Sequence, residues 1–102
     1  MWPFRRKSSV DEVIAVMDDA TEFACEKWLY FNSVLAFKPE VPFLDVLAGF
    51  LMPLIEGLNN NFPALRNSPE PLFLMIAARA IVRSGTHTRE EMEELLGFQI
   101  LE

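Results

Sequence analysis

The sequence has a single cysteine, Cys25, and a single histidine, His87. One cysteine cannot form an intramolecular disulfide, so the chain is not a small secreted scaffold held together by disulfides. A structural zinc site uses four Cys or His ligands, and a di-iron helical bundle uses Glu-x-x-His pairs on two helices. The sequence therefore predicts no metal site and no cofactor.

The residues that catalysis would use are equally scarce. The four glycines are scattered and form no phosphate-binding loop. Cys25 falls on the apolar side of the first predicted helix, near Trp28 and Leu29, which favours a buried, inert thiol over a Cys–His nucleophile pair. His87 lies in a turn and is expected to be solvated. We therefore expect a protein that is not an enzyme.

Positive charge is in short supply. Nine Lys and Arg residues stand against fifteen Asp and Glu residues, which gives a net charge of −6 and a pI of about 4.7. Non-specific binding to nucleic acid requires Lys and Arg to displace counterions, so direct nucleic-acid binding is not expected. The charge is also uneven, because Arg5, Arg6 and Lys7 are followed by a strongly acidic remainder.

Long uninterrupted hydrophobic runs are missing. The longest apolar segment, Phe43 to Leu58, contains Asp45 and Glu56 and is too short to span a bilayer. The basic residues near the N-terminus are followed by Ser8 and Ser9 and then by acids, not by the apolar stretch of a signal peptide. These features predict a cytoplasmic protein.

Apolar residues are nevertheless abundant: they make up 51% of the 102 residues, and nine of them are phenylalanine. This length is typical of one domain with one core. Two explanations for so many rings remain open. One is a tightly packed aromatic core, and the other is a homodimer or a docking surface for another protein.

Apolar spacing and helix caps predict four helices, near residues 10–37, 42–58, 69–84 and 89–96. Ser9 with Glu12, and Thr88 with Glu91, are spaced as capping boxes, while Gly85 and Gly97 are placed to end the last two helices. The fold class is all-α: a four-helix bundle-like single domain with a long N-terminal helix, a second helix kinked at Pro53 and a short C-terminal helix. Residues 1–8 are expected to be a flexible basic and aromatic tail, and residues 9–102 a single helical domain.

The first predicted helix carries a row of acids opposite its apolar stripe. Asp18, Glu22 and Glu26 are spaced at i, i+4 and i+8, where like charges mildly destabilise a helix. A merely solvated face is one explanation, and pairing with Arg79 and Arg83 inside the fold is another. The functional hypothesis is that the row, with Tyr30, binds a protein partner that has a basic surface.

The N-terminus provides a second candidate contact. Trp2 and Phe4 stand beside the basic residues and are candidates for insertion into a partner's groove or for contact with an anionic membrane through Trp2–Lys7. The segment is too short for strong membrane binding by itself, and a disordered tail is the alternative explanation.

Residues 77–97 resemble the two opening helices of a helix-turn-helix domain, with a Thr-x-Glu-Glu-x-x-x-Leu-Leu-Gly pattern in the second helix. The recognition helix should follow Gly97, but the sequence continues for only five residues. The function that we expect is non-enzymatic binding of another protein, of the inhibitor, immunity, antitoxin or accessory-subunit type. The alternative is a DNA-related role, either as a helix-turn-helix remnant or as an acidic DNA mimic that occupies a nucleic-acid-binding enzyme.

Overall fold

The computed structural model describes residues 2–35 and 40–100, and within the first helix it describes the side chains from Ala15 to Val34. The elements in chain order are α1 (Trp2–Leu35), α2 (Phe43–Asn61), the short 3-10 helix η1 (Pro63–Leu65), α3 (Glu70–Ser84) and α4 (Arg89–Leu96). Residues 2–35 and 40–100 contain no β-strand, which confirms the predicted all-α, bundle-like fold.

The first helix begins earlier than predicted. A start near residue 10 with Ser9 as N-cap is wrong, because the backbone is helical from Trp2 and Ser9 lies inside α1. Pro3 is compatible with the first turn, where the N–H that proline lacks would have no partner. Met1 and the side chains of residues 2–14 lie outside the described part of the chain. The flexibility expected of residues 1–8 and the contacts expected of Trp2 and Phe4 therefore stay predictions.

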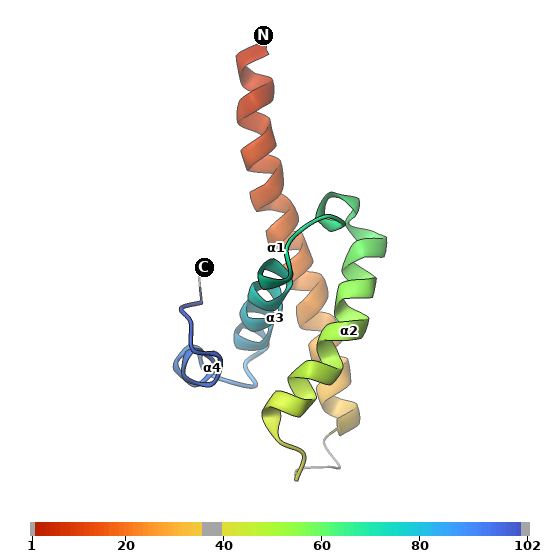
Figure 1. Ribbon diagram of the computed structural model, residues 1–102, viewed down its shortest axis with the longest axis vertical. Helices are drawn as coiled ribbons and strands as arrows, with labels where there is room; N and C mark the ends of the chain where they lie inside the picture. Colours follow the sequence, from red (N-terminus) through yellow and green to blue (C-terminus); the bar gives the residue numbers. More distant parts are fainter. Residues whose placement is uncertain (1, 36–39, 101–102) are drawn as a thin grey trace.

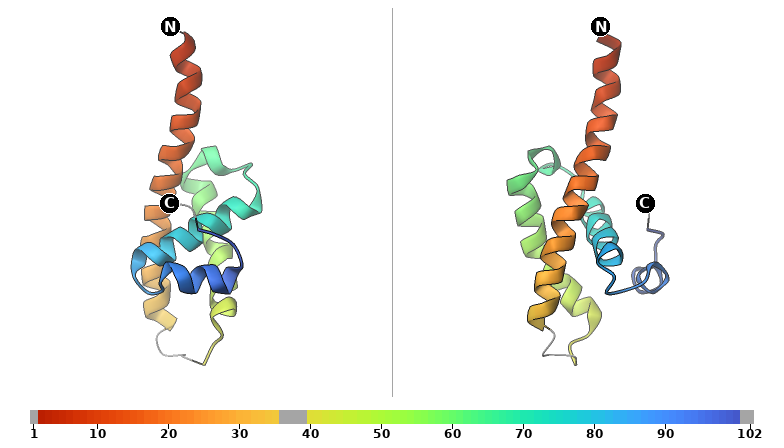
Figure 2. Two further views of the ribbon diagram at one scale, coloured as in Figure 1. Left: turned by 90° about the vertical axis from the view of Figure 1, so that its left-hand side faces the viewer. Right: turned by 180° about the vertical axis from the view of Figure 1, so that it is seen from behind.

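The length of α1 sets the shape of the molecule. Its 34 residues span about 51 Å at about 1.5 Å per residue, and the whole molecule measures 56 × 27 × 21 Å. The N-terminal part of α1 projects beyond the body that α2, α3, α4 and the other part of α1 form together (Figure 1). The same projection is visible from two further directions (Figure 2).

The second helix is continuous through Pro53 and extends three residues beyond the predicted end at Leu58. Figure 1 shows it bending along its length. The extension is stabilised locally, because the side-chain amide of Asn61 donates to the carbonyl oxygen of Gly57 at 2.8 Å and the Phe62 N–H donates to that of Leu58 at 2.7 Å.

The ends of the last two helices are as predicted. Gly85 and Gly97 adopt left-handed conformations, with φ of 81° and 78°, and end α3 and α4. Thr88 and Glu91 form the expected capping box: the Thr88 hydroxyl accepts from the Glu91 N–H, and the Glu91 carboxylate accepts from the Thr88 N–H at 2.8 Å. At the start of α3, Pro69 occupies the N-cap position without a side-chain hydrogen bond.

Small residues bring α1 and α3 close together. Ala20 and Ala24 of α1 are fully buried, as are Ala77, Ala78 and Ala80 of α3. Small side chains allow two helix backbones to approach each other, and α1 makes its most extensive helix contacts with α3. The nearly all-apolar α3 is therefore a central helix of the fold.

Aromatic rings fill the space between α1 and α2. Trp28 is fully buried, and its ring centroid lies 5.1 Å from that of Phe50 in an edge-to-face arrangement. Phe31 lies 5.4 Å from Phe50, and Phe43 lies 6.2 Å from Trp28. The core extends from here to Met92 of α4 and Ile100, so all four helices contribute to it. Within the described residues, every helix is too short or too polar to traverse a bilayer.

Candidate functional site

The acidic row predicted on α1 is only partly free. Glu22, Glu26 and Tyr30 are exposed, with Tyr30 at 72% exposure, and they follow one another along the helix surface. Asp18 is also exposed, but its Oδ1 accepts a hydrogen bond from Nη2 of Arg79 at 3.1 Å. Asp18 therefore links α1 to α3, and the acids that remain available for a partner are centred on Glu22 and Glu26.

The two arginines of α3 have different roles. The side chain of Arg79 is only 11% exposed and pairs with Asp18, which confirms the prediction that it contacts a carboxylate. Arg83 is exposed and makes no hydrogen bond or ion pair within the described part of the chain, so the same prediction is wrong for Arg83. The difference follows from position, because Arg79 lies against α1 where solvent cannot reach most of its side chain.

A small apolar pocket adjoins Tyr30 on the side facing α2. Its volume is about 240 Å³, and its lining comes from α1 and α2. The α1 side consists of Phe23, Lys27, Tyr30 and Phe31, and the α2 side of Phe50, Pro53, Leu54 and Gly57. The ammonium group of Lys27 lies 5.2 Å from the centroid of the Phe23 ring, so this cation stays at the pocket wall.

Further apolar side chains are exposed on the C-terminal half of α1. Leu29 is 46% exposed and Val34 is 53% exposed. At about 100° per residue, both fall on the outer face that also carries Glu26 and Tyr30. The outer face of α1 thus passes from acidic residues to apolar ones along a single helix.

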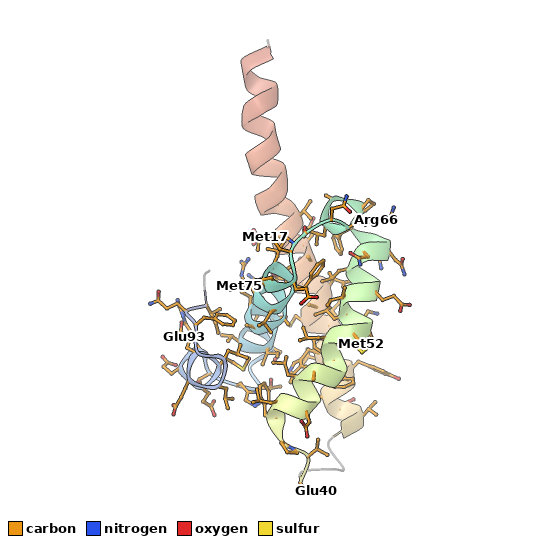
Figure 3. The ribbon with its side chains drawn as sticks, viewed as in Figure 1. Met17, Glu40, Met52, Arg66, Met75 and Glu93 are labelled. Carbon is orange, nitrogen blue, oxygen red and sulfur yellow. The ribbon has the colours of Figure 1, made fainter. Side chains whose placement is uncertain are left out.

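A larger groove of about 680 Å³ lies between α2, the N-terminal half of α3 and the segment after α4. Its lining includes Leu51, Phe73, Leu74 and Phe98, and among the described lining residues only Glu70 and Gln99 are polar. Figure 3 shows side chains between these elements, with Met75 labelled on α3. The described lining of this groove is thus almost entirely apolar.

His87 is not the solvated loop residue that was predicted. It is half-buried, with its ring centroid 4.6 Å from that of Phe43 and 6.5 Å from that of Trp28. Its Nδ1 lies 3.3 Å from Oγ1 of Thr86, so one ring nitrogen has a partner within the turn. The turn after α3 folds back onto the aromatic cluster, a long-range effect that no local pattern revealed.

Cys25 is only half-buried, where a buried thiol was expected, and its inertness stays a prediction. Burial raises the pKa of the Cys25 thiol above its ordinary value, and the positive charge of Arg83 offsets part of that effect. A raised pKa lowers the fraction of the reactive thiolate at neutral pH. In the described residues, no three His, Cys, Asp or Glu side chains are grouped so that they could hold a metal ion.

The structure thus places Glu22, Glu26 and Tyr30 together on α1, and it places Asp18 in an ion pair. The contacts of Trp2 and Phe4 lie outside the side chains that it describes. Sequence reasoning missed the pocket beside Tyr30, although Gly49, Pro53 and Gly57 give α2 a face with little side-chain bulk.

No protein-family model matches the sequence, and no significant match to it is found among curated proteins or among solved structures.

Proposed function

We propose that this chain is a non-enzymatic protein-binding module whose contact surface is the outer face of α1. The observation that carries the proposal is the arrangement of Glu22, Glu26 and Tyr30 in one exposed row beside an apolar pocket. The row supplies negative charge and a large exposed ring, and the pocket supplies a cavity for one apolar side chain. The occupant is a basic protein segment that carries an apolar side chain.

The charges favour such a partner. Glu22 and Glu26 are neighbours of like charge on the helix surface, and they form no ion pair within the described residues. Lys or Arg residues of a partner would relieve their repulsion. Complementary charge mainly accelerates and orients docking, so binding should weaken as salt increases.

The pocket favours an anchored contact. Tyrosine is enriched among the residues that dominate binding energies, and such residues cluster beside well-packed pockets. Tyr30 lines a cavity whose other walls include Phe23, Pro53 and Leu54, so an apolar side chain placed there would be removed from water on most sides. Its binding energy would come from apolar area buried between the two proteins.

The proposal is non-enzymatic because the residues that could perform chemistry are otherwise engaged. His87 packs on Phe43 and contacts Thr86, and Cys25 is a half-buried thiol with a raised pKa. The larger groove is almost entirely apolar.

The test compares protein capture by the parent chain with capture by three variants. Glu22→Lys/Glu26→Lys reverses the row, and Tyr30→Ala removes the anchor. Glu90→Lys/Glu94→Lys is the matched control, because it makes the same charge change at the same spacing on the exposed surface of α4. We expect a protein that is captured by the parent and the control and is lost with both α1 variants.

The captured protein is then purified, and its association rate with the parent chain is measured over a range of salt concentrations. Reversal of the row should lower the rate about tenfold or more and weaken its salt dependence. Capture that is equal for the parent and both α1 variants, all folded, contradicts the proposal.

A further inference from the structure

The described lining of the larger groove comes from three separate parts of the chain. Leu51 and Ile55 belong to α2, residues 70, 71 and 73–75 belong to α3, and Phe98 and Gln99 follow α4. The volume of about 680 Å³ falls within the roughly 300–1,000 Å³ that is typical of small-molecule sites. The groove therefore has the size of a site for one ligand.

The segment after α4 is held in place by its backbone. Ile100 is fully buried, and its carbonyl oxygen accepts a hydrogen bond from Nη2 of Arg89 at 2.7 Å. The Ile100 N–H donates to Oε2 of Glu93 at 2.8 Å, and Nε of Arg89 donates to the same carboxylate oxygen at 3.3 Å. These bonds fix Phe98 and Gln99 beside α3, so the groove is formed before any ligand binds, which lowers the cost of binding.

The apolar side chains of the lining are incompletely covered by the fold. Leu51, Ile55, Leu74, Met75 and Phe98 pack against the core, yet each remains only half-buried. An apolar ligand in the groove would remove more of their surface from water, which is favourable in proportion to the area buried.

The charge of the lining has one sign. Glu70 is the only charged residue of the described lining, which contains no lysine, arginine or histidine. Its side chain is exposed and forms no hydrogen bond or ion pair within the described part of the chain. Because Glu70 is the first residue of α3, its carboxylate lies at one end of the α3 side of the groove. A carboxylate only accepts hydrogen bonds, and its strongest partners are cationic N–H donors.

We propose that the groove binds a small molecule with an apolar body and one protonated amine. The apolar body fills the space between α2, α3 and Phe98, and the amine lies beside the carboxylate of Glu70. The proposed protein-binding face is separate, since no α1 residue belongs to the described lining of the groove. Failure of one proposal therefore leaves the other intact.

An apolar molecule with a carboxylate is the less suitable ligand. The helix dipole at the start of α3 favours a negative charge, but Glu70 already supplies that charge. A second carboxylate would meet Glu70 without a cation in the described lining to offset the repulsion, and the chain as a whole has a net charge of −6. The head group of the ligand is therefore a cation.

The test compares decylamine, decanol and decanoate, which share one alkyl chain and differ in the head group. Each is titrated into the full chain at neutral pH, below the concentration at which it forms micelles, and binding is followed by the methyl NMR signals of Leu51, Ile55 and Leu74. Decylamine should bind about three- to fivefold more tightly than decanol, which is the effect of one exposed ion pair. Decanoate should bind most weakly.

Two pairs of variants separate the head group from the apolar body. Glu70→Gln should make the affinities of decylamine and decanol equal, whereas the matched control Glu90→Gln removes the same charge from the exposed surface of α4 and should keep the preference. Leu74→Trp fills the groove and should abolish binding of all three probes. Leu44→Trp adds the same ring to an exposed position of α2 outside the described lining and should bind as the parent does.

Equal affinities for the three head groups overturn the proposal, as do tighter binding of decanoate and an absence of binding. Methyl shifts confined to Leu44 and Met52, which are exposed on α2 outside the described lining, would show that the probes coat the surface and would also overturn it. Circular dichroism checks that each variant stays helical. If Leu74→Trp fails to fold, the loss of head-group preference in Glu70→Gln decides the matter.

Discussion

Trp28 and Thr86, 58 residues apart in the sequence, are joined by a hydrogen bond in which Nε1 of the indole donates to the threonine hydroxyl at 2.8 Å. The indole is fully buried, and the hydroxyl is also 3.0 Å from Oγ of Ser84. The bond fixes the turn between α3 and α4 against the C-terminal part of α1. It therefore positions α4 relative to the face of α1 proposed to bind a partner.

Replacing Thr86 with Val should lower the free energy of unfolding by about 1–3 kcal/mol, because a buried indole N–H loses its acceptor while the side-chain shape is kept. Thr86→Ser is the matched control: it retains the hydroxyl and should stay much closer to the parent. Urea unfolding followed by the fluorescence of the tryptophans measures both. Equal stabilities for the two variants would show that the hydrogen bond contributes nothing.

The ion pair between Asp18 and Arg79 should respond asymmetrically to mutation. Asp18→Ala leaves the largely buried guanidinium of Arg79 without its carboxylate and should lower the free energy of unfolding by about 1–2 kcal/mol. The loss is no larger because water reaches the pair from the exposed aspartate side. Arg79→Met removes the whole cation, whose Nε has no hydrogen-bond partner within the described part of the chain. The free energy of unfolding of this variant should therefore stay within about 1 kcal/mol of the parent value. Chemical denaturation of both variants decides the order; a costlier Arg79→Met would contradict this account.

The sequence predicted those helix ends that depend on local chemistry. Gly85 and Gly97 end helices because they adopt left-handed conformations, and Thr88 with Glu91 begins α4 because both partners lie within four residues. Ser9 and Glu12 have the same spacing, but the helix continues through them. A capping box shows only that a helix is able to start at a position.

The parts of the candidate site that depend on tertiary contacts were harder to predict. The exposure of Glu22, Glu26 and Tyr30 follows from the helical period of α1, which the sequence displays. Pairing of the acidic row with the arginines of α3 was one of the expectations, but only the structure shows that the pair is Asp18 with Arg79. The half-buried position of His87 depends on where a whole turn docks, and neighbouring residues carry no signal for it.

Two glycines of α2 should differ in their tolerance of a methyl group. At Gly49 an added Cβ would lie 3.9 Å from the Phe31 ring, an ordinary contact, so Gly49→Ala should stabilise the protein by about 0.5–1 kcal/mol through its better helix propensity. At Gly57 the same atom would lie 3.2 Å from the Phe23 ring, so part or all of that gain should be lost. Thermal unfolding compares the two variants, and an equal gain at both sites would contradict tight packing at Phe23.

The last prediction concerns the stability of the fold at acid pH. The pKa of Glu91 is lowered, mainly because its carboxylate accepts the hydrogen bond from the Thr88 N–H. The pKa of Glu93 is lowered mainly because its carboxylate accepts from the Ile100 N–H at 2.8 Å. A carboxyl whose pKa is lower in the folded chain stabilises the fold above its unfolded pKa, near 4.5, and loses that contribution as the pH falls through the lowered value. Both groups therefore favour folding at neutral pH and cease to do so in acid.

Acidification below the ordinary glutamate pKa should consequently release α4 and the segment that ends at Ile100 before the rest of the core. Hydrogen exchange measures this release directly, since the amides of Thr88 and Ile100 should lose protection together as the pH falls, after correction for the intrinsic exchange rate. Glu91→Gln/Glu93→Gln should weaken their protection at neutral pH and flatten its pH dependence. Glu90→Gln/Glu94→Gln is the matched control, because it changes two exposed carboxyls of the same helix and leaves the hydrogen bonds of Glu91 and Glu93 in place. If both double variants show the pH profile of the parent, these carboxylates do not hold the two amides, and the docking of α4 depends on other contacts, such as the burial of Met92 and Ile100.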